Sequence, residues 1–183
     1  MIPRHACNRF NDITGMPMSM GKPSYLRVVW ERGNEDVVPK RDNRSRAKAL
    51  MASERRVKID SPADIVIARE HARAAAAEAG FSGCDSTLIT TAISEMTRNI
   101  LEYANHGEVT ISILRNGTRN GVKIVAIDFG PGIEDISRVM QDGYSSRRGM
   151  GMGLPGTKRL MDEFEIRSKV GKGTTITMMK WNR

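Results

Sequence analysis

Apolar residues recur at helical spacing in three stretches of the chain beyond residue 55. Between 85 and 103 they fall three or four positions apart, which predicts an amphipathic helix. A second helix is expected over 62–79, because Ser61 can cap its first turn and Gly80 can end it. A third, shorter helix is expected over 154–161.

Strand patterns lie between and around these helices. Five strands are expected, at 56–59, 108–114, 122–128, 164–168 and 174–181. A turn at Asn116-Gly117 is typical of an antiparallel hairpin between the second and third of them. Helices and strands are segregated rather than strictly alternating, which predicts an α+β fold with a mostly antiparallel sheet and helices on one face.

Residues 1–54 lack this regularity. Glycine and proline are frequent there, and only 25–30 (YLRVVW) resembles a strand. Ten Lys or Arg stand against five Asp or Glu in 1–50, so this part supplies most of the chain's net charge of +8. We interpret 1–54 as a disordered basic tail or as an extension from a misassigned gene start, and 55–183 as the folded domain.

The basic run KRDNRSRAK, at 40–48, has two interpretations. Five of its nine residues are basic, which suits phosphate binding and equally suits a solvated linker. No aromatic platform and no helix-turn-helix pattern accompanies it, so the solvated interpretation is favoured and nucleic acid is not the expected partner.

Composition argues against several other classes of protein. No window approaches 18 consecutive apolar residues and the first twenty residues lack an apolar core, so neither a membrane span nor a secretory signal is expected. The two cysteines and three histidines are scattered, without metal-ligand spacing or a disulfide framework. A cytoplasmic protein is therefore expected.

Candidate chemistry first emerges at two polar positions of a helix and one strand end. Glu95 and Asn99 lie four positions apart on the polar side of the longest predicted helix, within reach of a shared ligand. Asp128 ends an apolar strand, and Gly130 and Gly132 after it allow the backbone to approach another group closely.

Two glycine-rich segments complete the set. Residues 149–153 lead into a helix N-terminus, where free N–H groups favour phosphate, and 171–175 turn tightly into the last strand. Each pattern alone has a structural explanation as a solvated face, turn or loop, but their order and intervals are specific in combination. The match of 151–156 to G-x-G-x-x-G lacks a preceding strand, which argues against a dinucleotide fingerprint.

In this order the patterns resemble the GHKL (Bergerat) ATP-binding fold shared by gyrase, Hsp90, histidine kinases and bacterial anti-sigma-factor kinases. The segment from Glu95 to Asn99 resembles its N box, 128–132 its first glycine box, and 149–153 and 171–173 the later ones. The chain is most similar to the anti-sigma-factor-type serine kinases that act as switch proteins. The resemblance covers 56–181 and implies a two-layer α/β sandwich.

The resemblance also implies ATP and Mg²⁺ as ligands. Asn99 would ligate a magnesium ion that bridges the ATP phosphates, Glu95 would act as general base toward a serine hydroxyl, and Asp128 would accept a hydrogen bond from adenine. The other implied nucleotide contacts are glycines and threonines, namely Gly130, Gly132, Gly149, Gly151, Gly153, Gly173, Thr174 and Thr175. Arg147 and Arg148 could contact the phosphates or an acidic partner, or be solvated.

The implied function is that of an ATP-dependent protein-serine kinase and partner-switching regulator in a bacterial stress-response pathway that controls a sigma factor. Such a kinase would phosphorylate a STAS-domain antagonist or scaffold protein and, once released, activate a serine phosphatase. Two alternatives stay open: an anti-sigma-factor kinase that binds a sigma factor directly, and an ATP-gated binding module without turnover.

Overall fold

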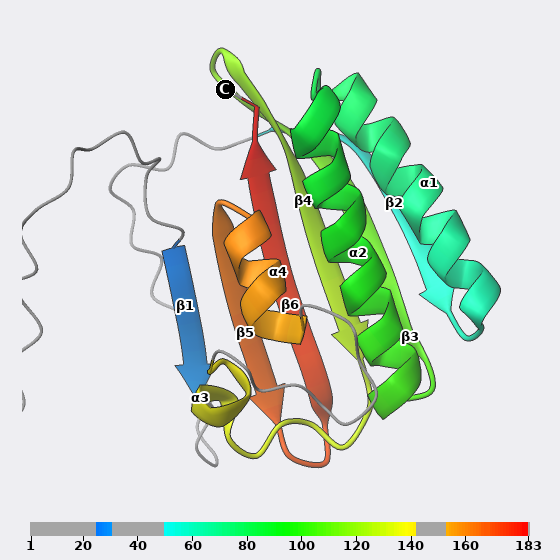
Figure 1. The fold of residues 1–183 in the computed structure, drawn as a ribbon, viewed down its shortest axis with the longest axis vertical. Coiled ribbons are helices and arrows are strands. Elements are labelled where there is room, and N and C mark those ends of the chain that lie inside the picture. Colours follow the sequence, from blue (N-terminus) through cyan, green and yellow to red (C-terminus); the bar gives the residue numbers. More distant parts are fainter. Residues whose placement is uncertain (1–24, 31–49, 142–152, 183) are drawn as a thin grey trace, which may run out of the picture.

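The computed structural model of the chain describes residues 25–30, 50–141 and 153–182 (Figure 1). Its strands form one layer and its helices lie on one face of that layer. The elements in chain order are β1 (Tyr25–Trp30), β2 (Leu50–Ile59), α1 (Pro62–Glu78), α2 (Gly83–Tyr103), β3 (Gly107–Asn116), β4 (Arg119–Asp128), α3 (Ile136–Val139), α4 (Gly153–Leu160), β5 (Glu163–Lys169) and β6 (Gly173–Trp181). The predicted α+β fold is confirmed.

The six strands form one sheet in the order β1-β5-β6-β4-β3-β2. All neighbours run antiparallel except β1, which lies parallel to β5. The hairpin predicted around Asn116-Gly117 is confirmed, since Asn116 pairs with Arg119 and Gly117 has a φ of 60°. At the opposite end of the hairpin, β4 brings Asp128 beside Thr174 of β6.

The sheet begins earlier in the chain than the predicted boundary between 54 and 55. Residues 25–30 form the edge strand β1, and β2 starts at Leu50 rather than near residue 56. Charged residues hide this extension from a hydrophobic pattern: Arg55 pairs with Ile111, a core residue, and its guanidinium forms an ion pair of 3.0 Å with Glu78 of α1. A position on the helix-covered face is thus occupied by a cation.

The start of α1 follows the sequence signals. Ser61 is the N-cap and Pro62 the first helical residue. Asp64 Oδ2 accepts hydrogen bonds from the backbone N–H groups of Asp60 and Ser61, at 3.0 and 2.8 Å, and from the Ser61 hydroxyl at 2.9 Å. These hydrogen bonds, the one from the Asp60 backbone first, hold the pKa of the Asp64 carboxyl below its ordinary value.

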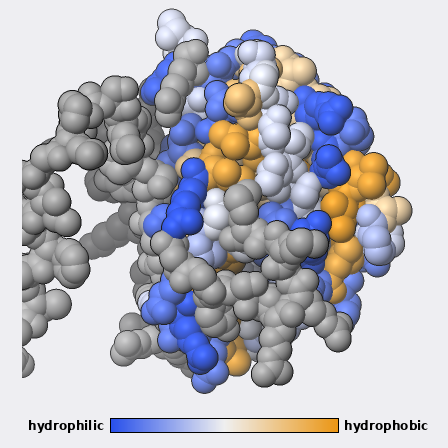
Figure 2. Space-filling model, in the orientation of Figure 1, coloured by the Kyte–Doolittle hydropathy of each residue, from blue (hydrophilic) through white to orange (hydrophobic). Residues whose placement is uncertain are grey.

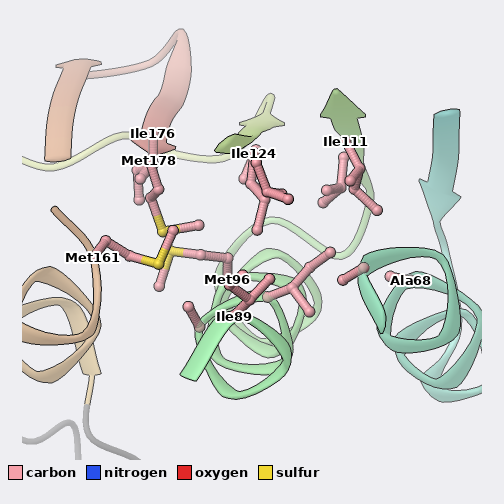
Figure 3. Close-up of a cluster of buried hydrophobic side chains, with 14 of the residues drawn as sticks. Ala68, Ile89, Met96, Ile111, Ile124, Met161, Ile176 and Met178 are labelled. Carbon is pink, nitrogen blue, oxygen red and sulfur yellow. The ribbon is translucent and has the colours of Figure 1, made fainter. Parts of the chain in front are cut away.

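The core lies between the sheet and the helices (Figure 3). Side chains of β3, β4 and β6, including Ile111, Ile124 and Met178, point toward Met96 and Ile89 of α2. All five are at most 1% exposed. Burial of this continuous apolar layer fixes α2 over the middle of the sheet. The polar residues on the other side of the helix, Glu95 and Asn99 among them, are thereby held in place.

The helical face of the molecule is chemically mixed (Figure 2). Apolar residues are exposed over α1, where Val66 and Ile67 remain 57% and 46% exposed. Within the described ranges, no helix combines the length and apolar character that crossing a membrane requires.

Candidate nucleotide site

A cavity of about 390 Å³ opens between α2, the loop that follows β4, and the start of α4. Its lining includes six of the residues singled out from the sequence: Glu95, Asn99, Asp128, Gly132, Gly153 and Thr174. Residues separated by up to 79 positions in the sequence therefore meet at one concave site. A cavity of this size is within the range of small-molecule and cofactor sites.

One wall of the cavity is a single face of α2. Glu95, Asn99 and Tyr103 recur at four-residue spacing, so their side chains lie in a row along the helix. Glu95 is only 8% exposed, whereas Tyr103 is 48% exposed. The row therefore runs from a buried carboxylate to an accessible aromatic ring.

Asp128 stands on the facing wall and is held by backbone donors. Its Oδ1 accepts hydrogen bonds from the N–H groups of Gly130, at 2.9 Å, and Thr174, at 3.2 Å. Its Oδ2 accepts no hydrogen bond from the residues that the structure describes. A carboxylate fixed through one oxygen can present the other to an N–H donor of a ligand.

Ser168 joins the elements behind this wall. Its hydroxyl lies 2.9 Å from Thr174 Oγ1, accepts a hydrogen bond of 2.8 Å from the Ile133 N–H and donates one of 3.1 Å to the Gly173 carbonyl. The serine thereby connects β5, β6 and the loop after β4. No sequence pattern marks it, because its partners come from three separate segments.

Two glycines are required by backbone crowding behind Asp128. Gly132 has a φ of +74°, and a Cβ there would collide with the carbonyl oxygen of Lys169. Gly173 has a φ of +95°, and its Cβ would collide with the carbonyl oxygen of Asp128. Both positions favour glycine because the backbone is left-handed there and because no space is left for a side chain. The group that each glycine approaches closely is another segment of the protein backbone.

The remaining predicted residues divide into three groups. Gly130 packs against Ala104, and a Cβ at Gly130 would lie 2.7 Å from the alanine Cβ. Neither Gly130 nor Gly173 is among the described residues that line the cavity. Thr175 follows Thr174 on a strand and therefore faces the other side of the sheet, so of the two threonines the cavity receives Thr174. Four residues lie outside the described ranges: Gly149, Gly151, Arg147 and Arg148.

Several lining residues were not singled out from the sequence. Arg98 and Tyr103 share the helical stripe of Glu95 and Asn99, so helical spacing alone could have identified them. The apolar part of the lining, which comprises Ile133, Val139, Leu154 and Ile176, comes from four separate elements and loops and carries no such signal.

Among the described residues that line the cavity, negatively charged side chains outnumber positively charged ones. Its carboxylates are Glu95, Glu102, Asp128, Glu134 and Asp135, whereas Arg98 and Arg138 are its cations among the described residues. An anionic ligand placed here needs additional positive charge. Within the described part of the chain, no group of three or more His, Cys, Asp or Glu could hold a metal ion by protein ligands alone.

Comparison with known proteins decides the family. Residues 60–180 match the model of the histidine kinase-like ATPase domain. The chain belongs to this family. It is 50% identical over 127 residues to the serine/threonine-protein kinase RsbT of Bacillus subtilis, a match that covers 69% of this chain and 96% of the relative. It is also 36% identical over 97 residues to an anti-sigma F factor of Caldanaerobacter subterraneus, covering 51% of this chain and 68% of the relative.

A solved structure supports the fold of this histidine kinase-like ATPase domain. The structure of the RsbU and RsbW domains of Rv1364c from Mycobacterium tuberculosis matches with a TM-score of 0.51 and 21% identity. The match covers 72% of this chain, which spans about a third (33%) of that longer protein. The expected family is therefore confirmed by sequence, and its fold by structure.

Proposed function

We propose that the chain is an ATP-dependent protein-serine kinase that phosphorylates a STAS-domain protein in a partner-switching pathway. The observation that carries this proposal is the meeting of Glu95, Asn99 and Asp128 around one cavity in a homologue of the RsbT kinase. The first two residues suit phosphate chemistry, and the third suits recognition of a base.

The base of ATP would lie at the Asp128 end of the cavity. Asp128 Oδ2 would accept a hydrogen bond from the adenine amino group, because Oδ1 is already engaged by Gly130 and Thr174. The accessible Tyr103 ring lines the same cavity and can cover a planar base. The phosphates would then extend along α2 toward Asn99 and Glu95.

The donors near the phosphates fit Mg²⁺. Asn99 offers an amide oxygen, a hard ligand of the kind that this ion takes, and Mg²⁺ is usually held by one or two protein groups together with substrate phosphates. When bound, the ion would neutralise phosphate charge in a cavity whose described lining is mainly acidic. Gly153 at the start of α4 lines the cavity, and the amides of Gly149 and Gly151 would join it around the phosphates.

Glu95 would serve as the general base. Its carboxylate would take the proton from a serine hydroxyl of the protein substrate as the serine oxygen bonds to the γ-phosphorus and the bond to the ADP oxygen breaks. Such a base contributes about 10²- to 10⁴-fold to the rate. Positioning and neutralisation of charge would supply most of the remainder.

The proposed partner is a STAS-domain antagonist or scaffold protein, and the released kinase would activate a serine phosphatase in the cytoplasm. Similarity to anti-sigma F factors, including the 36% identity over 97 residues, supports a second candidate. In that case the chain binds a sigma factor directly and phosphorylates its antagonist. The two differ in whether a purified sigma factor forms a stable complex with the chain.

Transfer of phosphate from radiolabelled ATP to a STAS-domain protein that co-purifies with this chain, or that a neighbouring gene encodes, tests the proposal. Wild-type protein with Mg²⁺ should label a serine, and Glu95→Gln should bind ATP normally but label the serine about 10²- to 10⁴-fold more slowly. Nucleotide-dependent complex formation without labelling would overturn the kinase and favour the binding module. Labelling at the wild-type rate by Glu95→Gln would overturn the assignment of the base.

A further inference from the structure

Arg98 forms the ion pair that holds the carboxylate of Glu95. Its Nη1 lies 2.7 Å from Glu95 Oε1, and the two residues are separated by three positions on α2. The Glu95 side chain is 11% exposed and that of Arg98 is 52% exposed. Both line the cavity, so the pair joins a buried carboxylate to a cation at the cavity surface.

The pair restricts Glu95 more than an ordinary surface ion pair would. A buried carboxylate loses hydration and needs a partner to offset that loss. Both members belong to one helix whose buried side is packed against the sheet, so their backbones are fixed relative to each other. Short, charge-assisted hydrogen bonds of this kind are also the stronger ones.

The pairing is asymmetric at the carboxylate. Oε1 accepts the hydrogen bond from Arg98, whereas Oε2 receives none from the described residues. One oxygen is therefore anchored while the other is available at the cavity. A general base requires this arrangement, since it must be held in place and yet keep a lone pair for the incoming proton.

We propose that Arg98 is a positioning residue, which anchors Glu95 through Oε1 so that Oε2 receives the proton of the substrate serine. This role rests on the proposed kinase function. The serine O–H proton passes to Oε2, the serine oxygen bonds to the γ-phosphorus, and the electron pair of the broken phosphorus–oxygen bond leaves with ADP. Arg98 itself touches neither the serine nor the phosphorus in this scheme.

The alternative is that Arg98 binds ATP phosphate directly. Measured nucleotide affinities distinguish this phosphate-binding role from the positioning role. A phosphate ligand contributes to the affinity for a triphosphate more than to that for ADP. A positioning residue changes the turnover number and leaves both affinities nearly unchanged. Arg98→Gln should therefore lower kcat about 10- to 100-fold, with Kd values for ADP and a non-hydrolysable ATP analogue within about threefold of wild type.

Three further variants make the test specific. Arg98→Lys keeps the cation and should recover most of the lost kcat, because a lysine can still reach a carboxylate. Arg98→Gln should have no additional effect in a Glu95→Gln background, since the residue acts through Glu95. Arg73→Gln removes an exposed arginine of α1 outside the described lining and is the matched control, with unchanged kcat.

Two outcomes would overturn the positioning role. One is loss of triphosphate affinity by more than about tenfold in Arg98→Gln with kcat preserved at saturating ATP. The other is a full additional loss of kcat in the double variant, which would mean that Arg98 acts independently of Glu95.

An NMR measurement that needs no enzymatic turnover tests the anchoring of Glu95 by Arg98 separately from the proposed kinase function. The Cδ resonance of Glu95 in carbon-13-labelled protein is assigned by its disappearance in Glu95→Gln. It should shift in Arg98→Gln and stay in place in Arg73→Gln. An unshifted resonance overturns the anchoring even in a protein that transfers phosphate, whereas a shifted one with no transfer in the wild type overturns the kinase alone.

Discussion

The two ends of β6 hold charged groups in opposite ways. At one end, Lys180 is 7% exposed, donates a hydrogen bond of 3.0 Å to the Leu160 carbonyl and lies within 3.9 Å of Asp85 and Asp162. At the other end, Thr174 pairs with Asp128, whose Oδ2 accepts no hydrogen bond from the described residues. The Lys180 end is satisfied within the protein, whereas the Asp128 end has polar atoms available to a ligand.

This contrast separates stability from function within a single sheet. Charges that are mutually satisfied contribute to the free energy of folding and do not attract a ligand. Partly satisfied charges in a concave site are typical of binding and catalysis. Changes at the Asp128 end should therefore alter activity and leave stability nearly unchanged, and changes at the Lys180 end should do the reverse.

The largest expected effect is that of Glu95→Ala. Loss of the base should lower phosphoryl transfer by about 10²- to 10⁴-fold, while calorimetry finds ATP affinity within about threefold of wild type. The thermal midpoint should stay close to that of wild type. A parallel loss of ATP affinity would assign Glu95 to binding rather than to proton transfer.

Asn99→Ala should remove the magnesium-dependent part of nucleotide binding. The amide oxygen is the proposed ligand of the ion, so the affinity for ATP measured with Mg²⁺ should fall to the value measured with a chelator. Circular dichroism should be unchanged, because Asn99 is part-exposed on the cavity side of α2. An unchanged affinity with Mg²⁺ would contradict the assignment.

Asp128→Asn should reduce selection of adenine. The amide retains an acceptor but lacks the charge, and a hydrogen bond to a charged group contributes about 1.5–3 kcal/mol. Affinity for ADP should therefore fall about 10- to 100-fold, with a smaller change for a nucleotide that lacks the adenine amino group. Equal losses for both nucleotides would show that Asp128 does not recognise that group.

Lys180→Met tests the satisfied end. The apolar stem is retained, but the Leu160 carbonyl loses its donor, so the free energy of unfolding should fall by about 1–3 kcal/mol. ATP affinity and kcat of the folded variant should match the wild type. A change in kcat without a loss of stability would contradict the separation of the two ends.

The smallest effect is expected at Asp64, as a pH dependence. Its pKa is lowered in the folded protein, chiefly by the backbone hydrogen bond from Asp60, so its stabilisation is present above the ordinary carboxyl pKa and is lost as pH falls through the lowered value. At pH 7 the thermal midpoint of the wild type should be higher than that of Asp64→Asn. The difference should shrink from about pH 5 downward. A constant difference would contradict the linkage.

Sequence reasoning succeeded where periodicity and order in the chain carry the information. The stripe of α2 placed Glu95 and Asn99 on one face, and the turn at Gly117 fixed the hairpin that ends at Asp128. It failed where a charged residue occupies the helix-covered face, as Arg55 does in β2, because an apolar pattern cannot reveal such a position.

Contacts between distant segments could also not be predicted from the sequence. Ser168 bonds with Thr174 and Ile133, and nothing local distinguishes it from other strand serines. The choice between Thr174 and Thr175 needed the side of the sheet on which each lies. Spacing alone allows Arg98 to reach Glu95, but only the folded helix shows that the carboxylate is buried.

A crystal structure of the chain with Mg²⁺ and a non-hydrolysable ATP analogue tests most directly whether this cavity is the nucleotide site. The adenine amino group should lie within hydrogen-bond distance of Asp128 Oδ2, the metal should be bound by the Asn99 amide oxygen, and the γ-phosphate should face Glu95. A nucleotide bound elsewhere, or bound in the cavity with its base away from Asp128, would contradict the assignment.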